Sequence, residues 1–324
     1  MGRRRRLEET LEALRAVRHD PRAESSIAEL RRVIESEGSH AVARAAAIAG
    51  EHGLEALAGD LAAAFPRFFE KPEKTDPGCS AKTALVEALR RLDQPAVALY
   101  RRGAAHVQTE PVFGGRVDTA VDLRGASALA LAEHGGSEVL VDLAHLLADP
   151  EPPVRVSAAR AAAVHGGEAA IPLLHLKAIA GDEEPLVVAE CLLSLLRLDA
   201  PSQLPFVASL LENDGRAEAA ASALGDSRLA EALPILRGWL PRAAPRGLGR
   251  AALFALAALR RDDAVDLLLE VVRDEPAPLA RDAVAALASI RADAAMRERV
   301  HAAAGARPEL RDALARAFER PGGA

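Results

Sequence analysis

The sequence predicts an all-α protein in which about eight pairs of helices are stacked in one row. Three observations lead to this fold class. Apolar residues recur at the spacing of an amphipathic helix through most of the 324 residues. One helical pattern returns at a nearly constant interval along the chain. No stretch alternates between apolar and polar residues over a useful length, so strands are not expected.

The repeat is clearest in two segments that align without a gap, DLRGASALALAEHGG from Asp122 and PVRVSAARAAAVHGG from Pro153. The same pattern returns in segments that begin at residues 185, 215, 247 and 278. Successive starts are 30 to 32 residues apart, which indicates a solenoid whose units each cover the apolar side of the next. Because only 3% of the residues are aromatic, we expect a core of small aliphatic side chains between closely spaced helices.

The expected elements follow one another within a single domain, residues 1–324. From the N-terminus we expect a basic capping helix, irregular repeats with two long loops, regular repeats and a C-terminal cap: residues 1–20, 21–134, 135–306 and 307–324. The helix pairs of the irregular part are residues 23–35 with 40–51, 54–69 with 81–92, and 95–106 with 119–134. In the regular part, the helices that precede the repeated ones begin near residues 137, 168, 202, 229 and 263. Pro308 opens the last helix.

The charge and cysteine content restrict the function classes. The formal net charge is −6 and the pI about 5.9, so a field that attracts nucleic acid or an anionic membrane is not expected. The run Arg3–Arg6 fits a solvated first helical turn or a disordered start, with an interaction tail as the alternative. No apolar stretch follows it, and no run reaches membrane-spanning length, so no secretion signal or membrane partner is expected. Two cysteines, Cys79 and Cys191, cannot form a disulfide framework, which favours the reducing cytoplasm.

Prolines and spaced charges give the repeat a recognisable pattern. Prolines lie inside three of the expected first helices, at Pro172, Pro205 and Pro234. An aspartate precedes a basic residue by six positions in three units: Asp76 and Lys82, Asp118 and Arg124, and Asp149 and Arg155. This pattern resembles the HEAT repeat, and the resemblance covers roughly residues 40 to 300. It implies a right-handed α-α superhelix in which such pairs form a hydrogen-bonded ladder between neighbouring turns. Val188 stands six residues after Asp182, so the ladder should stop or change there.

The pair Asp118 and Arg124 allows two interpretations. An aspartate and an arginine could act as the acid and the electrophile of a catalytic loop. The same pairing recurs in neighbouring units, however, which favours a structural joint that satisfies backbone groups at helix starts.

Two turns between paired helices are long, residues 70–82 and 107–117. They occupy the same position in adjacent units, and insertions at equivalent positions of a solenoid project from one edge. We therefore expect the two loops to lie side by side. Their candidate binding residues are Glu73, Lys74, Cys79, Gln108, Glu110, Phe113 and Arg116.

Three features of these loops suggest chemistry. Cys79 precedes Ser80, an expected helix N-cap, so the helix could lower the pKa of its thiol; the alternative is a partly buried thiol. Phe113 is either a plug packed on the solenoid or an exposed anchor for a partner. Gly114 and Gly115 lack the spacing of a phosphate-binding loop, and a tight turn with positive φ is the expected role.

The leading functional expectation is a non-catalytic scaffold. Its concave helical surface would bind a helix or an extended segment of another protein, with the two long loops at its edge. No CxxC, HxxxH or HExxH motif occurs, so we expect neither a metal nor another cofactor.

Two alternatives come from other HEAT-like proteins. Phycobilin lyases resemble this architecture, which implies a small-molecule carrier or enzyme centred on Cys79. Alkylpurine DNA glycosylases built from HEAT-like repeats imply a repair function, although the acidic charge and the few aromatic residues disagree with their basic groove. The segments KTDPGCSAKTAL and QTEPVFGGRVDTAVDLRG are also similar to bacterial HEAT-repeat proteins with no assigned function.

Overall fold

The computed structural model describes residues 2–290 and 293–318, with side chains from residue 7 onward. The end of the expected C-terminal cap, residues 319–324, lies outside the described residues. Helices account for nearly all regular structure in the described chain, so the prediction of an all-α fold is confirmed. A single two-stranded hairpin is the exception within these residues, and strands were not expected. None of the helices in this part of the chain has both the length and the apolar character needed to cross a membrane.

The chain forms two compact units, residues 1–170 and 171–324. The helices of the first unit are α1 (Gly2–Val17), α2 (Glu24–Ser36), α3 (Ser39–Glu51), α4 (Ala58–Ala64), α5 (Pro72–Thr75), α6 (Ser80–Arg91), α7 (Val97–Ala104), α8 (Val121–His134), α9 (Val139–Leu146) and α10 (Pro152–His165). Its 3₁₀ helices are η1 (Glu55–Leu57), η2 (Phe65–Phe69), η3 (Pro77–Cys79) and η4 (Glu168–Ala170). Its strands are β1 (Thr109–Val112) and β2 (Gly115–Asp118).

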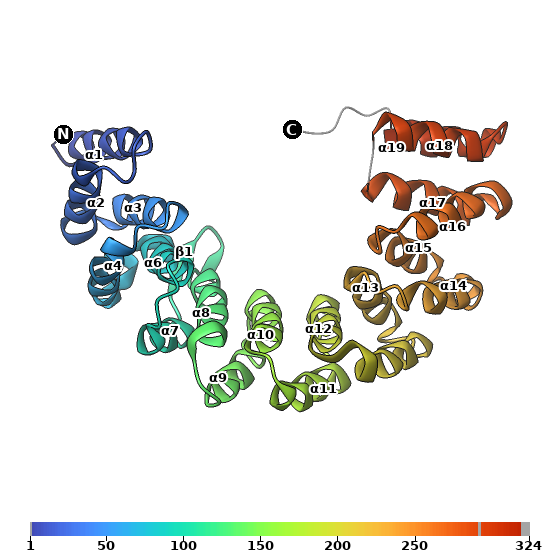
Figure 1. Ribbon diagram of the computed structural model, residues 1–324, viewed down its shortest axis with the longest axis horizontal. Helices are drawn as coiled ribbons and strands as arrows, with labels where there is room; N and C mark the ends of the chain where they lie inside the picture. Colours follow the sequence, from blue (N-terminus) through green and yellow to red (C-terminus); the bar gives the residue numbers. More distant parts are fainter. Residues whose placement is uncertain (1, 291–292, 319–324) are drawn as a thin grey trace. The chain divides into compact units, whose positions relative to one another are not determined.

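Helices of the first unit form two layers. The row α3, α6, α8 and α10 packs each helix against the next, and α2, α4, α7 and α9 lie on its other side (Figure 1). Small residues allow this close approach. A Cβ atom placed on Gly50 of α3 would lie only 3.0 Å from the Cα atom of Ala88 in α6. The long helix expected at residues 54–69 is instead divided into η1, α4 and η2. The helix α4 ends just before Pro66, which cannot donate a helical hydrogen bond.

The second unit continues the alternation of helices. Its α-helices are α11 (Ile171–Ala180), α12 (Pro185–Ser209), α13 (Ala217–Ser227), α14 (Ala232–Ala243), α15 (Gly249–Ala258), α16 (Asp262–Asp274), α17 (Ala277–Ile290), α18 (Ala294–Ala304) and α19 (Arg311–Phe318). Its 3₁₀ helices are η5 (Leu210–Glu212), η6 (Ala244–Arg246) and η7 (Pro308–Leu310), the last of which leads into α19.

The helix α12 is two helices that meet at Asp199. The backbone of this residue, with φ −155° and ψ 80°, is not helical, and its carboxylate accepts a hydrogen bond from the backbone N of Ser202 at 3.3 Å. Pro201 and Pro205 follow soon after. A proline fits the first turn of a helix, but within the helix it kinks or breaks it. The repeat in the sequence predicts the same division, with separate helices that begin at residues 185 and 202.

One row of the second unit consists of α12, α13, α15, α17 and α19, each packed against the next (Figure 1). The helices α14 and α16 lie on the other side of this row, and α18 packs against α16 and α17. The core is mostly alanine, leucine and valine, with Trp239 of α14 as its largest fully buried side chain. Alanines of α13 and α15 also line a groove that lies on α12, α13, α15 and α17.

Candidate functional site

The first long loop, residues 70–82, is folded around Asp76. Its carboxylate accepts hydrogen bonds from the backbone N of Ala81 at 2.9 Å and of Lys82 at 3.0 Å, which caps the start of α6. The Nζ atom of Lys82 lies 3.0 Å from the same carboxylate and donates to the carbonyl of Phe68 at 3.1 Å. Both charged side chains are fully buried. Asp76 and Lys82 therefore hold the loop against the helices beneath it.

Cys79 is buried in this loop, which contradicts the interpretation of an activated thiol and agrees with the alternative of a buried one. The residue adopts a left-handed backbone with φ 57° just before α6, and its side chain has no exposed surface. Burial raises the pKa of the Cys79 thiol to about 12, because the charged thiolate is poorly solvated there. Proximity to the helix N-terminus does not compensate for this burial.

The second long loop contains a β-hairpin that the sequence pattern did not indicate. Strands β1 and β2 pair antiparallel, with Val112 opposite Gly115. Phe113 and Gly114 form the turn, and Gly114 has a φ of 87°, a conformation that favours glycine. The strands have only four residues each, and one of them includes Pro111, so alternation of residue types is too short to signal them.

Glu110 fastens the hairpin to the first loop. Its carboxylate accepts hydrogen bonds from the backbone N of Gly78 at 2.8 Å, from Gln108 Nε2 at 2.6 Å and from Thr119 Oγ1 at 2.9 Å. Gln108 is buried and also donates to the carbonyl of Asp76 at 2.8 Å. The two loops therefore lie side by side. Desolvation raises the pKa of Glu110, but these three hydrogen bonds outweigh it and leave the pKa below its ordinary value.

Asp118 and Arg124 connect the hairpin to the next helix pair of the first unit. Asp118 Oδ1 accepts from the backbone N of Gln108 and of Ala120, while its Oδ2 lies 2.7 Å from Arg124 Nη1. Arg124 reaches on to Asp149, with Nε and Nη2 at 2.8 and 3.0 Å from the two carboxylate oxygens. Its exposed fraction is 2%. One buried arginine thus joins the aspartates of two consecutive helix pairs. We call this contact a rung.

Opposing effects set the pKa values of this rung. Burial alone would raise the pKa of Asp118, yet the hydrogen bonds from Ala120, Gln108 and Arg124 hold it below its ordinary value. Burial alone would lower the pKa of Arg124, but its contacts with Asp149 and Asp118 leave it raised. Asp118 and Arg124 are therefore charged at neutral pH, and their hydrogen-bonding capacity is used in holding the fold.

The remaining charges of this series lie in different arrangements. Arg155 donates to the backbone carbonyls of Asp149 at 2.8 Å and Pro150 at 2.9 Å. In the second unit, Asp182 accepts from the backbone N of Glu184 at 2.9 Å and lies 2.8 Å from Lys177 Nζ. Lys177 precedes Asp182 by five residues, so the arrangement changes where Val188 replaces the basic residue.

The predicted binding residues separate into two groups. Cys79, Gln108 and Glu110 lie within the contacts that hold the two loops together. Glu73 and Lys74 are exposed on α5, and Arg116 is exposed on β2, where it donates to the carbonyl of Thr109 at 2.5 Å. No hydrogen bond or ion pair joins Glu73 or Lys74 to the hairpin within the described residues.

Phe113 is fully exposed at the hairpin turn, so its interpretation as a plug packed on the helices is wrong. Three valines near it in the chain are also exposed, Val107, Val112 and Val117, with exposed fractions of 61%, 50% and 44%. We call these four side chains the hairpin patch. The sequence pointed to Phe113 alone, because valines in a predicted loop give no signal of their exposure.

A small cluster of side chains beneath the loops was also not predicted from the sequence. The ring of Phe69 lies 4.7 Å from that of His106, and the guanidinium of Arg102 stacks on Phe69 at 4.0 Å. His106 Nε2 is 3.2 Å from Gln108 Oε1. Burial lowers the pKa of His106, which favours its neutral form at pH 7. This packing supports the base of the hairpin from the α7 side.

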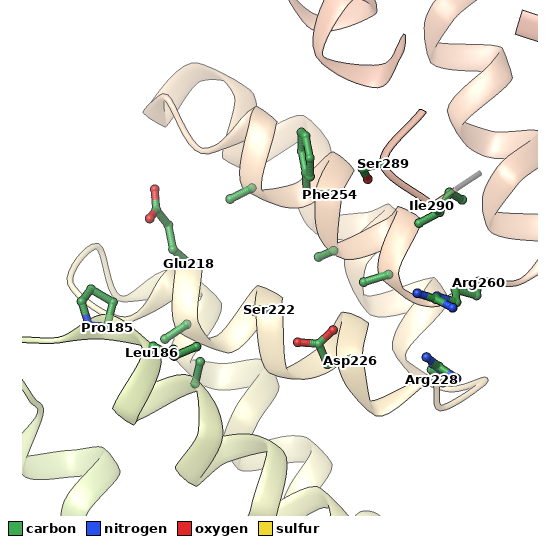
Figure 2. Close-up of a pocket in the computed structure, with 15 residues that line it drawn as sticks. Pro185, Leu186, Glu218, Ser222, Asp226, Arg228, Phe254, Arg260, Ser289 and Ile290 are labelled. Atoms are coloured by element: carbon green, nitrogen blue, oxygen red, sulfur yellow. The ribbon is translucent and has the colours of Figure 1, made fainter. Parts of the chain in front are cut away.

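The second unit contains a groove that sequence reasoning did not identify. It has a volume of about 520 Å³ and lies across α12, α13, α15 and α17. Figure 2 shows Glu218 and Leu186 at one side of it and Arg228 and Arg260 at the other, with Phe254 between helices. We call it the arginine groove. Its size lies within the range of ligand pockets.

Neither a metal site nor a known relative adds to this picture. Within the part of the chain that the structure describes, no three His, Cys, Asp or Glu side chains cluster in a way that could hold a metal ion. No known protein-family model matches the chain, and no curated protein matches it.

Proposed function

We propose that the protein is a non-catalytic HEAT-repeat scaffold of the cytoplasm, which uses the hairpin patch to bind another protein. The observation that carries this proposal is the full exposure of Phe113 at the turn of β1 and β2. An aromatic side chain left in water forgoes the free energy of burial, and partner binding would recover it. Aromatic residues are also the side chains that most often dominate binding energy.

The hairpin is braced before any partner arrives. Glu110, Gln108 and Asp118 bind backbone groups of both loops and of the start of α8. A preorganised projection loses little conformational entropy on binding, which favours affinity. The exposed side chains of the hairpin patch suit an apolar cleft between helices of a partner.

The groups that could have supported chemistry are used in structure. Asp118 and Arg124 bind each other, Arg124 also binds Asp149, and Cys79 is buried with a raised pKa. This use favours the scaffold over a catalytic loop and over a carrier centred on Cys79. Both cysteines are free and buried, which fits the proposed location in a reducing compartment.

Co-purification tests the proposal directly. The tagged protein and its Phe113→Ser variant are recovered from the native host, and bound proteins are identified by mass spectrometry. We expect one specific partner whose recovery falls about tenfold or more with Phe113→Ser, as for the loss of a hot-spot residue. The control is Leu176→Ser, which removes a side chain of α11 that is 67% exposed and should leave recovery unchanged. Equal capture by wild type and Phe113→Ser would exclude the hairpin patch as the binding surface.

A further inference from the structure

We propose that the arginine groove of the second unit binds an acidic segment of a partner protein, one whose carboxylates are flanked by apolar side chains. This inference rests on the proposed scaffold function, but it concerns another surface and names the chemistry of the ligand. It follows from the groove floor, from two arginines at its end, and from its continuation along the same row of helices.

The floor of the groove is apolar and open. Alanines of α13 and α15, among them Ala219 and Ala255, keep the backbone of neighbouring helices close to the surface. Leu186 is 57% exposed, and Phe254 and Ile290 also line the groove (Figure 2). Aliphatic side chains of a ligand would bury this area, which a bare anion could not use.

Arg228 and Arg260 lie at one side of the groove (Figure 2). Neither guanidinium makes a hydrogen bond or an ion pair with another described residue, although most arginines elsewhere in this unit do, as Arg246 does with Asp214 at 2.6 Å. Two acidic residues, Glu218 and Asp226, also line the groove. Two unpaired forked cations can receive carboxylates bidentately.

The two arginines occupy equivalent positions, each just after a helix and with a left-handed backbone. Arg228 and Arg260 stand 32 residues apart, after α13 and α15, with left-handed φ values of 55° and 54°. Glycine is the residue best suited to this conformation, and Gly247, with φ 76° and ψ 6°, fills such a position after η6. Arginine is therefore a strained choice here. It places a cation at the end of each helix, on the groove.

Arginines continue along the row of helices. A second groove, about 560 Å³ in volume, lies on α15, α17 and α19 and therefore shares two helices with the first. It is lined by Arg250, Arg281 and Arg316 over a floor that includes Ala285 and Ala288. Among the described residues, only Arg250 pairs with an acid of that groove, Asp282, at 2.7 Å. Together the two grooves are lined by five arginines and three acids, so the row is locally cationic although the whole chain carries a net charge of −6. A local excess of arginine suits an elongated acidic ligand.

A peptide fits these grooves better than a nucleic acid. Single-stranded nucleic acids are usually held by several aromatic rings on which bases stack. Of the described side chains that line either groove, Phe254 alone is aromatic, and Arg250 already covers it, with its guanidinium 4.6 Å from the ring centroid. Alanine floors instead match the side chains of a helix or an extended peptide.

Selection from a random library of 12-residue peptides displayed on phage tests the proposal, with the full-length protein as bait. We expect the enriched peptides to combine aspartate or glutamate with leucine-like residues. A fluorescein-labelled copy of the most enriched peptide should bind at least tenfold more weakly to the double variant Arg228→Gly, Arg260→Gly. Its affinity for the variant Arg237→Ala, which lacks an exposed arginine of α14 outside the groove, should equal its affinity for the wild type.

The glycine substitutions separate binding from folding. Because glycine relieves the left-handed strain, the double variant should unfold at a Tm no lower than that of the wild type. Enrichment of peptides without acidic bias, failure to enrich any peptide, or binding retained by the double variant would each overturn the proposal. Tighter binding of a 12-residue oligo-dT than of the peptide would overturn it in favour of nucleic acid. The variant Phe113→Ser should keep peptide binding, so failure of the hairpin patch and failure of the groove can be told apart.

Discussion

The guanidinium of Arg124 contacts the carboxylate of Asp149 through two hydrogen bonds, although the residues are 25 positions apart. The same side chain also binds Asp118, which lies six residues before it. A cation between two carboxylates lets each of them cap backbone groups without leaving an unpaired buried charge. The carboxylate of Asp118 accepts hydrogen bonds from the backbone N of Ala120 and of Gln108, and that of Asp149 accepts one from the backbone N of Glu151. The rung is therefore both an electrostatic contact and a means of starting two helices.

Replacing Arg124 should destabilise the first unit strongly. Arg124→Ala leaves Asp118 and Asp149 close together without a cation, and we expect the free energy of unfolding to fall by about 3 kcal/mol or more. Arg124→Lys should fall between wild type and alanine, because an ammonium cannot make the forked contact. Urea unfolding followed by circular dichroism measures both. The control is Arg90→Ala, which breaks a partly exposed pair with Glu133 and should cost about 1 kcal/mol or less.

The contact between the two loops should depend on pH. The pKa of Glu110 is lower in the folded protein than in the unfolded chain, so the contact is fully stabilising above about pH 4.5 and weakens as the pH falls through the lowered pKa. The amide resonance of Gly78, which donates to Glu110, reports this by NMR. We expect it to shift at a pH below the ordinary titration of a glutamate. In Glu110→Gln this shift should vanish, whereas a shift at or above the ordinary value would contradict the assignment.

Much of this arrangement could be predicted because it is encoded locally and repeated. The six-residue spacing of Asp118 and Arg124 places an aspartate before a helix and a basic residue near its start, and the two side chains are 2.7 Å apart. The equivalent positions of the two long loops predicted their adjacency, which the contact of Glu110 with Gly78 shows. Periodicity and short spacing are visible in one sequence, since neighbouring residues produce them.

Burial and pocket formation depend on distant residues, and these the sequence did not reveal. Cys79 has polar neighbours in the sequence but is enclosed by the folded loop, while apolar Phe113 projects from a four-residue strand pair. Arg228 and Arg260 follow ordinary helical patterns, and only their left-handed backbone and the helices facing them create the arginine groove. Local preference does not determine which side of a turn faces solvent.

The thiol of Cys79 should react slowly in the folded protein. With a pKa of about 12 and no exposed surface, it carries almost no thiolate at pH 8, and the same holds for Cys191. We expect N-ethylmaleimide to label neither residue within minutes, and both after unfolding in urea, as measured by intact mass. A matched control is Ala105→Cys, at an exposed position that follows α7, which should be labelled at once. Rapid labelling of Cys79 in the native protein would revive a thiol-centred function.

Glycines in the second unit should respond to substitution according to what faces them. A Cβ atom on Gly225 of α13 would lie 2.5 Å from the carbonyl oxygen and 2.9 Å from the Cα atom of Ala255 in α15. Both are backbone atoms of the neighbouring helix, so Gly225→Ala must separate α13 from α15. We expect a loss of about 1–3 kcal/mol in the free energy of unfolding.

Gly238 provides the opposite case for the same substitution. It is an exposed residue within α14, and a Cβ atom added to it would meet no atom within 4 Å beyond its own helix. Alanine has the higher helix propensity, so Gly238→Ala should stabilise the protein by up to about 1 kcal/mol. Opposite signs for Gly225→Ala and Gly238→Ala in urea unfolding would show that close helix contact, rather than glycine content, governs stability here. Equal effects of the two substitutions would mean that α13 and α15 are not held at the distance described, and the floor of the arginine groove would lose its basis.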